Sequence, residues 1–113
     1  MTTTETGRRA ETAATGYLAT HGFAILDRNW RTRWCEIDLI VRRDQTVYFV
    51  EVKYRARPNW GSGLDYITPA KLRQMRFAAQ LWQSATGYAG QCQLLAVAVG
   101  GPDFTVERAV VIS

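Results

Sequence analysis

The chain has 113 residues, of which 47% are hydrophobic, so it can form one domain with a core and is too apolar to be disordered. Its length excludes a large multidomain enzyme. The 14 basic and 10 acidic residues give a net charge of +4, a balance compatible with a polyanionic partner such as nucleic acid.

The N-terminal part of the sequence predicts a polar tail and then one helix. Residues 1–5 are expected to form a disordered tail ahead of a single domain over residues 6–113. Thr6 is a residue type that caps helix N-termini, and apolar residues recur after it at helical spacing. The helix is expected to end at His21-Gly22, because glycine favours the position that follows a helix.

The rest of the chain predicts five strands and one further helix. The second helix is expected to start at Thr68-Pro69 and to end at Gly87, with Met75 and Trp82 in its buried stripe. Runs of β-branched and aromatic residues predict strands over 23–26, 34–41, 46–54, 91–99 and 104–112. The order αβββαββ therefore predicts an α/β fold whose mixed β-sheet is flanked by helices, because one strand follows a crossover helix.

Targeting signals and cysteine pairs are not evident in the sequence. The first residues lack the apolar stretch of a signal peptide, and the longest apolar run is far shorter than the roughly 18 residues of a membrane span. We therefore expect a cytoplasmic protein without membrane contact. Cys35 and Cys92 are isolated and His21 is the only histidine, which argues against a disulfide scaffold, a structural zinc site and catalysis by paired histidines.

Acidic residues are concentrated on the second and third predicted strands. Residues two apart share a face of a strand, so pairing of these strands as a hairpin would gather Glu36, Asp38, Glu51 and Lys53 on one face. Glu11 shares a face of the first helix with core residues and would add a fourth acid. Crowded carboxylates repel one another, and Mg²⁺ (or Mn²⁺) would relieve that repulsion and activate water for attack on a phosphate.

The alternative interpretation of the same residues is an ordinary exposed sheet face. Lys53 would then pair with Glu51 or Asp38 for little energy. The spacing of the residues leaves both interpretations open.

Basic and aromatic residues accompany the acidic cluster. Trp60, in the predicted loop over 55–67, would stack on an unpaired base or pack its own loop. Arginine forks and helix N-termini suit phosphates, and the alternative is a solvated surface. The residues expected to bind a nucleic-acid backbone are Arg31, Arg33, Arg55, Arg57, Lys71 and Arg73.

Several motifs in a fixed order identify a family resemblance. They include Gly7-Arg8-Arg9-Ala10-Glu11, Glu36-Ile37-Asp38-Leu39-Ile40, Phe49-Val50-Glu51-Val52-Lys53-Tyr54-Arg55 and Ile67-Thr68-Pro69-Ala70-Lys71. This pattern resembles the YraN-like family of uncharacterised bacterial proteins, and the resemblance spans roughly residues 7–85. The resemblance implies a restriction-endonuclease-like, PD-(D/E)xK nuclease fold, with a layout similar to that of archaeal Holliday-junction resolvases.

The resemblance also implies roles for the acidic cluster. Asp38 and Glu51 would be the main Mg²⁺ ligands, Glu11 an accessory acid and Lys53 the partner of the attacking water. Glu36 belongs to the family motif and would support the ligands without binding the ion. Among the departures from the pattern, Cys35 stands where the family usually has glycine, which adds bulk beside the site strand.

The function that this resemblance implies is metal-dependent hydrolysis of DNA phosphodiester bonds, with branched or damaged DNA in repair or recombination as the expected substrate. One alternative is a nucleic-acid-binding module that keeps the nuclease fold without cleavage, and a weaker one is a scaffold for a larger DNA-processing partner. A homodimer is expected, since 113 residues leave little surface to bind a junction alone.

Overall fold

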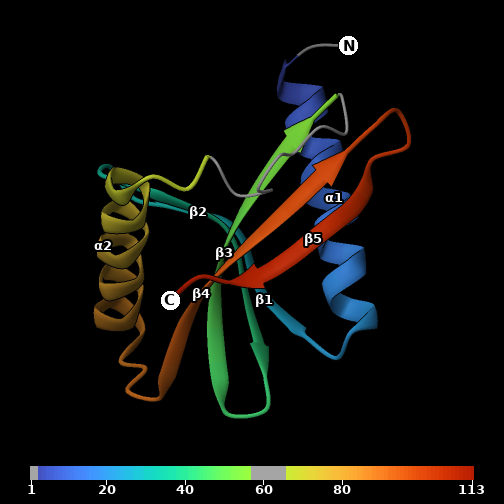
Figure 1. Ribbon diagram of the computed structural model, residues 1–113. Coiled ribbons are helices and arrows are strands. Elements are labelled where there is room, and N and C mark those ends of the chain that lie inside the picture. Colours follow the sequence, from blue (N-terminus) through green and yellow to red (C-terminus); the bar gives the residue numbers. More distant parts are fainter. Residues whose placement is uncertain (1–2, 57–65) are drawn as a thin grey trace.

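Five strands form one mixed sheet with a helix on either face (Figure 1). The computed structural model describes residues 3–56 and 66–113. Its elements are α1 (Thr3–Thr20), β1 (Ala24–Arg31), β2 (Glu36–Arg43), β3 (Thr46–Arg55), α2 (Pro69–Thr86), β4 (Gln91–Gly100) and β5 (Thr105–Val111). The predicted element order and α/β class are therefore confirmed.

The strands follow one another across the sheet in chain order, β1-β2-β3-β4-β5. β3 and β4 pair in parallel because α2 carries the chain back between them, and every other neighbouring pair is antiparallel. The mixed sheet expected from one crossover helix is thus confirmed.

Each helix covers one face of the sheet with a small set of apolar side chains. Ala10, Ala14 and Leu18 of α1 are almost fully buried in a cluster with the centres of β2, β3 and β4. On the opposite face, α2 buries Met75 and Trp82, as the helical spacing predicts. The Trp82 ring meets Phe49 of β3 edge to face at 5.4 Å, which fixes α2 against the strand that carries Glu51 and Lys53.

The ends of α2 lie where the sequence predicts them. The Thr68 hydroxyl accepts a hydrogen bond from the Lys71 N–H at 3.1 Å, and Pro69 occupies the first turn. Gly87 ends the helix in the left-handed conformation, with φ at 75°. This start places Lys71 in the first turn of α2.

Two boundaries near the N-terminus differ from the prediction. α1 begins at Thr3, so residues 3–5 are helical where a disordered tail is expected, and Thr6 is not the N-cap. Glu5 then lies in the first turn, where a carboxylate interacts favourably with the helix dipole. β1 continues through residues 27–31, because an edge strand pairs on one side and can leave polar side chains such as Asp27 and Arg28 in water, while Trp30 packs against the core on the α2 side.

Within residues 3–56 and 66–113, no helix is long and apolar enough to cross a membrane. Cys35 and Cys92 are both free thiols with intermediate burial.

Candidate metal centre and its surroundings

β2 and β3 separate at the end of the sheet that carries the acidic residues. Their pairing runs from Arg43↔Thr46 to Leu39↔Val50 and stops there. One residue further on, Asp38 Oδ2 accepts a hydrogen bond from the Val52 N–H at 2.8 Å. A side-chain carboxylate therefore bridges the two strands at the point where their backbones part.

The side chains of β2 also depart from strict alternation between the two faces of the sheet at this point. Ile37 and Ile40 both pack in the cluster under α2, whereas Leu39 and Val41 pack in the cluster under α1. Strict alternation predicts Ile37 on the same face as Leu39, and that expectation is wrong. The alternation fails where β2 stops pairing with β3 at Asp38, while β2 stays paired with β1 through Glu36.

Negative charge is concentrated around Asp38. Burial is the main cause that raises the pKa of this carboxyl from 3.8 to about 7, followed by the charge of Glu51. Glu11 and Glu36 raise it further, while the Val52 N–H opposes the rise by stabilising the carboxylate. The structure therefore brings the four predicted acids within electrostatic reach of one another, from α1, β2 and β3.

The four acids do not share one face. Glu11 and Asp38 line a pocket of about 380 Å³ beside α1, and Glu51 lines a pocket of about 260 Å³ beside α2. Glu36 lines both pockets and lies between them. Among the described residues, no three His, Cys, Asp or Glu side chains form a group that could hold a metal ion. The structure thus gathers the acids without closing them into one ligand set.

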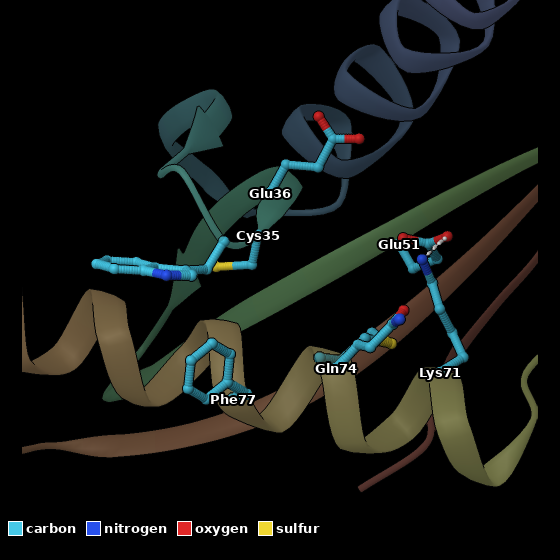
Figure 2. A pocket seen from close by; sticks show the side chains of 8 residues that line it. Cys35, Glu36, Glu51, Lys71, Gln74 and Phe77 are labelled. Carbon is cyan, nitrogen blue, oxygen red and sulfur yellow. Dashed lines mark ion pairs between the residues drawn. The ribbon is translucent and has the colours of Figure 1, made fainter.

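The lysine that contacts an acid of this cluster is Lys71. Its Nζ lies 3.0 Å from Glu51 Oε2, and Figure 2 shows this pair at one end of the smaller pocket. Lys53 is exposed and makes no ion pair with any residue of the described segments. The sequence signal for the Lys71 position is the capping pattern at Thr68-Pro69, which places this lysine in the first turn of α2.

Sequence reasoning missed Tyr66, which directly follows the undescribed segment. Burial raises the pKa of its hydroxyl well above the ordinary value, and the nearby charges of Glu51 and Asp38 act in the same direction. Tyr66 therefore lies beside the acids. Its position in a predicted loop hid it, although a large aromatic residue just before the helix start at Thr68 is a signal for packing. Asn29 was also missed and lines the larger pocket.

Two of the predicted phosphate-binding arginines lie next to the site. Arg31 forms an exposed ion pair with Glu36, with 3.5 Å between Nη2 and Oε2. The Arg33 guanidinium lies 5.2 Å from the centre of the Trp34 ring. Arg31 lines the larger pocket, and Arg33 lies against the ring of Trp34, which lines the smaller one.

The remaining predicted nucleic-acid contacts are divided between the described and undescribed parts of the chain. Arg55, at the end of β3, and Arg73, on α2, are exposed. Arg57 and Trp60 lie outside the described residues.

Comparison with known sequences places the chain in a family. The model of the uncharacterised protein family UPF0102 matches residues 10–99. A UPF0102 protein from Vibrio parahaemolyticus is 45% identical over 78 residues, which cover 69% of this chain and 64% of that protein. A relative from Chlorobium chlorochromatii is 42% identical over 97 residues, which cover 86% of this chain and 75% of the relative.

The segment that the family model matches, residues 10–99, includes the whole acidic cluster, with Glu11, Asp38 and Glu51. A UPF0102 protein from Leifsonia xyli is 44% identical over 78 residues, and the match covers 66% of its length. The chain thus spans slightly less than two thirds of the Vibrio and Leifsonia relatives. The match over most of its own length shows that the chain belongs to the uncharacterised protein family UPF0102, the YraN-like family that its motifs resemble.

Proposed function

We propose that the protein is a metal-dependent endonuclease that hydrolyses phosphodiester bonds of DNA, on a restriction-endonuclease-like core. The observation that supports this proposal is the half-buried Asp38 carboxylate, held between parting strands by the Val52 N–H and surrounded by three other carboxylates. Negative charge in such a position is unfavourable without a cation. A divalent metal ion would offset it.

The residue types fit Mg²⁺ or Mn²⁺, which bind a few carboxylate oxygens and keep several waters. Asp38 and Glu51 would hold the ion, with Glu11 of α1 as an accessory acid on the side of the larger pocket. When bound, the ion would polarise a phosphoryl oxygen and lower the pKa of a bound water. Lys53 is exposed and therefore free to orient that water, and Glu36 supports the site through its ion pair with Arg31.

The DNA backbone would be bound by exposed cations around the acids. Arg31, Arg33 and Arg73 present guanidinium groups that suit phosphate oxygens and carry no sequence preference. Branched or damaged DNA is the substrate class that we propose.

Purified protein is expected to cut labelled DNA only when Mg²⁺ or Mn²⁺ is present. Branched and linear DNA of matched sequence are incubated with metal or with a chelator, and the products are resolved on a denaturing gel. RNA strands of the same sequence are incubated in parallel, and they test whether the protein cleaves DNA in preference to RNA. Absence of metal-dependent cutting on every substrate would contradict the proposal.

A second candidate function is nucleic-acid binding without cleavage. The observation that favours it is the Lys71–Glu51 ion pair, which neutralises one proposed metal ligand at 3.0 Å. DNA binding that weakens steeply with salt, with no cutting under any metal, would support this alternative.

Removal of the Lys71 ammonium is expected to strengthen metal binding. Lys71→Met frees the Glu51 carboxylate, and loss of a competing ion pair worth about 1 kcal/mol corresponds to roughly fivefold tighter Mn²⁺ binding. Isothermal titration of Mn²⁺ measures the change. Arg76→Met is the matched control, because Arg76 is another cation of α2 that donates a hydrogen bond to Ser113, and the metal affinity of this variant should equal that of the wild type. Equal affinities for Lys71→Met and the wild type would show that the ion pair does not compete with the metal.

A further inference from the structure

The pocket beside α2 has an aromatic end that the proposed chemistry does not use. Trp34 is 68% exposed and Phe77 is 47% exposed, and both side chains line the pocket that also contains Glu51 and Lys71. Figure 2 shows Phe77 and Cys35 at one end of this pocket, and the Glu51–Lys71 pair at the other. Two large exposed aromatic residues beside one cavity indicate a binding surface.

The turn that presents Trp34 is held in place by hydrogen bonds. The Thr32 hydroxyl oxygen accepts from the N–H groups of Trp34 at 3.1 Å and Cys35 at 3.3 Å. The Thr32 N–H donates to the Cys35 carbonyl at 2.8 Å. The exposed indole therefore stands on an ordered connection between β1 and β2, and less entropy is lost when a ligand packs against it.

Side chains on α2 follow a chemical order along the pocket. Lys71, Gln74 and Phe77 are spaced three residues apart, so they line one side of the helix over a rise of about 9 Å. Figure 2 shows Gln74 between the lysine and the phenylalanine. Along its length, the pocket thus offers first a cation, then an amide with both a donor and an acceptor, and then an aromatic ring.

We infer that this pocket binds one unpaired nucleobase of the DNA substrate. This inference rests on the proposed function, and it names the substrate class as DNA with at least one unstacked base near the cleaved bond. Trp34 and Phe77 would contact the faces of the base, since aromatic stacking tolerates every base. The Gln74 amide would pair with the polar edge of the base, and Lys71 would attract an adjacent phosphate.

The chemistry of the pocket favours a base over an apolar segment of a protein. An apolar side chain would cover Gln74 and Lys71 without pairing with them, whereas a nucleotide offers an aromatic face, a polar edge and a negative charge. The Arg33 guanidinium at 5.2 Å from the Trp34 ring adds positive charge at the aromatic end. The two carboxylates that line the pocket, Glu36 and Glu51, are each paired with a cation. The Gln74 amide, the aromatic rings and the Arg33 charge therefore favour a nucleotide.

The test compares binding of two labelled DNAs by fluorescence anisotropy with a chelator present. One is a fully paired duplex, and the other is the same duplex with one unpaired base. Wild type is expected to bind the second DNA about tenfold more tightly, as one stacked base allows. Trp34→Ala and Phe77→Ala should each lose at least about fivefold on that DNA and less than twofold on the paired duplex, and Trp34→Phe should keep the preference.

Leu26→Ala is the matched control, because Leu26 is 47% exposed, as Phe77 is, and lies outside the pocket. Equal losses on both DNAs, or no loss in either aromatic variant, would overturn the inference. A change in sedimentation of Trp34→Ala without a change in DNA preference would instead show that a second copy covers the pocket.

Cleavage with Mg²⁺ separates this inference from the proposed function. If wild type cuts DNA without any preference for the unpaired base, the base-binding pocket is refuted and the endonuclease stands. If wild type prefers the unpaired base and cuts nothing, the pocket stands and the endonuclease is refuted.

Discussion

Asparagine in place of Asp38 is expected to lower metal-dependent cleavage of DNA at least about 100-fold. A neutral amide is a poor ligand for Mg²⁺, and loss of the ion removes several kcal/mol of stabilisation from the transition state. The asparagine oxygen can still accept the hydrogen bond from Val52, so the strands should keep their positions. Initial rates at saturating Mg²⁺ measure the effect.

Asp27→Asn is the matched control for the cleavage measurement. The Asp27 carboxylate is exposed, accepts a backbone hydrogen bond from the Arg28 N–H at 2.8 Å and lines neither pocket, so we expect the rate of this variant to stay within about threefold of wild type. An Asp38→Asn variant that cuts as fast as wild type would show that other residues bind the metal.

The same Asp38→Asn substitution is expected to stabilise the folded protein at pH 8 by up to about 4 kcal/mol. Folding raises the pKa of this carboxyl from 3.8 to about 7, and each pH unit of that rise corresponds to about 1.4 kcal/mol. Between these two pKa values the unfolded chain releases the proton while the folded chain keeps it. The stability of wild type therefore falls as the pH rises through this window, and the loss is complete above pH 7.

Urea unfolding of both proteins at pH 5 and pH 8 measures this difference. The advantage of the asparagine variant should shrink to less than half at pH 5, where the folded carboxyl is still protonated. Saturating Mg²⁺ at pH 8 should stabilise wild type and leave the variant unchanged, because binding to the folded state alone adds stability. A variant that is less stable than wild type at pH 8 would refute this account of the charge.

Opposite effects of one substitution on activity and stability would identify Asp38 as a functional residue. A carboxylate that destabilises the fold at neutral pH has no structural advantage over asparagine. The three neighbouring acids increase that cost, since each adds to the charge that Asp38 meets.

The limits of a helix were predictable where the residues that determine them lie within the helix or next to it in the sequence. The limits of α2 depend on Thr68, Pro69 and Gly87, and each acts through its own backbone conformation or hydrogen bond. The start of α1 was missed because the first turn contains no proline or other residue that prevents a helix from extending to Thr3.

The identity of the acidic residues was predictable, but their arrangement was not. Strict alternation holds along β2 from Leu39 to Val41, where β3 pairs with it, and fails beyond Asp38, where β2 pairs with β1 alone. The contact between Lys71 and Glu51 depends on how α2 docks, which Phe49 and Trp82 determine from segments far apart in the chain. Information of this kind resides in tertiary packing and not in spacing.

The bond between Asp38 and Val52 has a consequence for how this site can change over time. One oxygen atom of Asp38 bridges the two strands, and the negative charge on the same group would serve the proposed metal binding. Asparagine would retain the bridge and remove the charge, whereas an apolar residue would leave the Val52 N–H without its acceptor. A relative with asparagine at this position would therefore keep the same arrangement of β2 and β3 after losing the proposed metal-dependent cleavage.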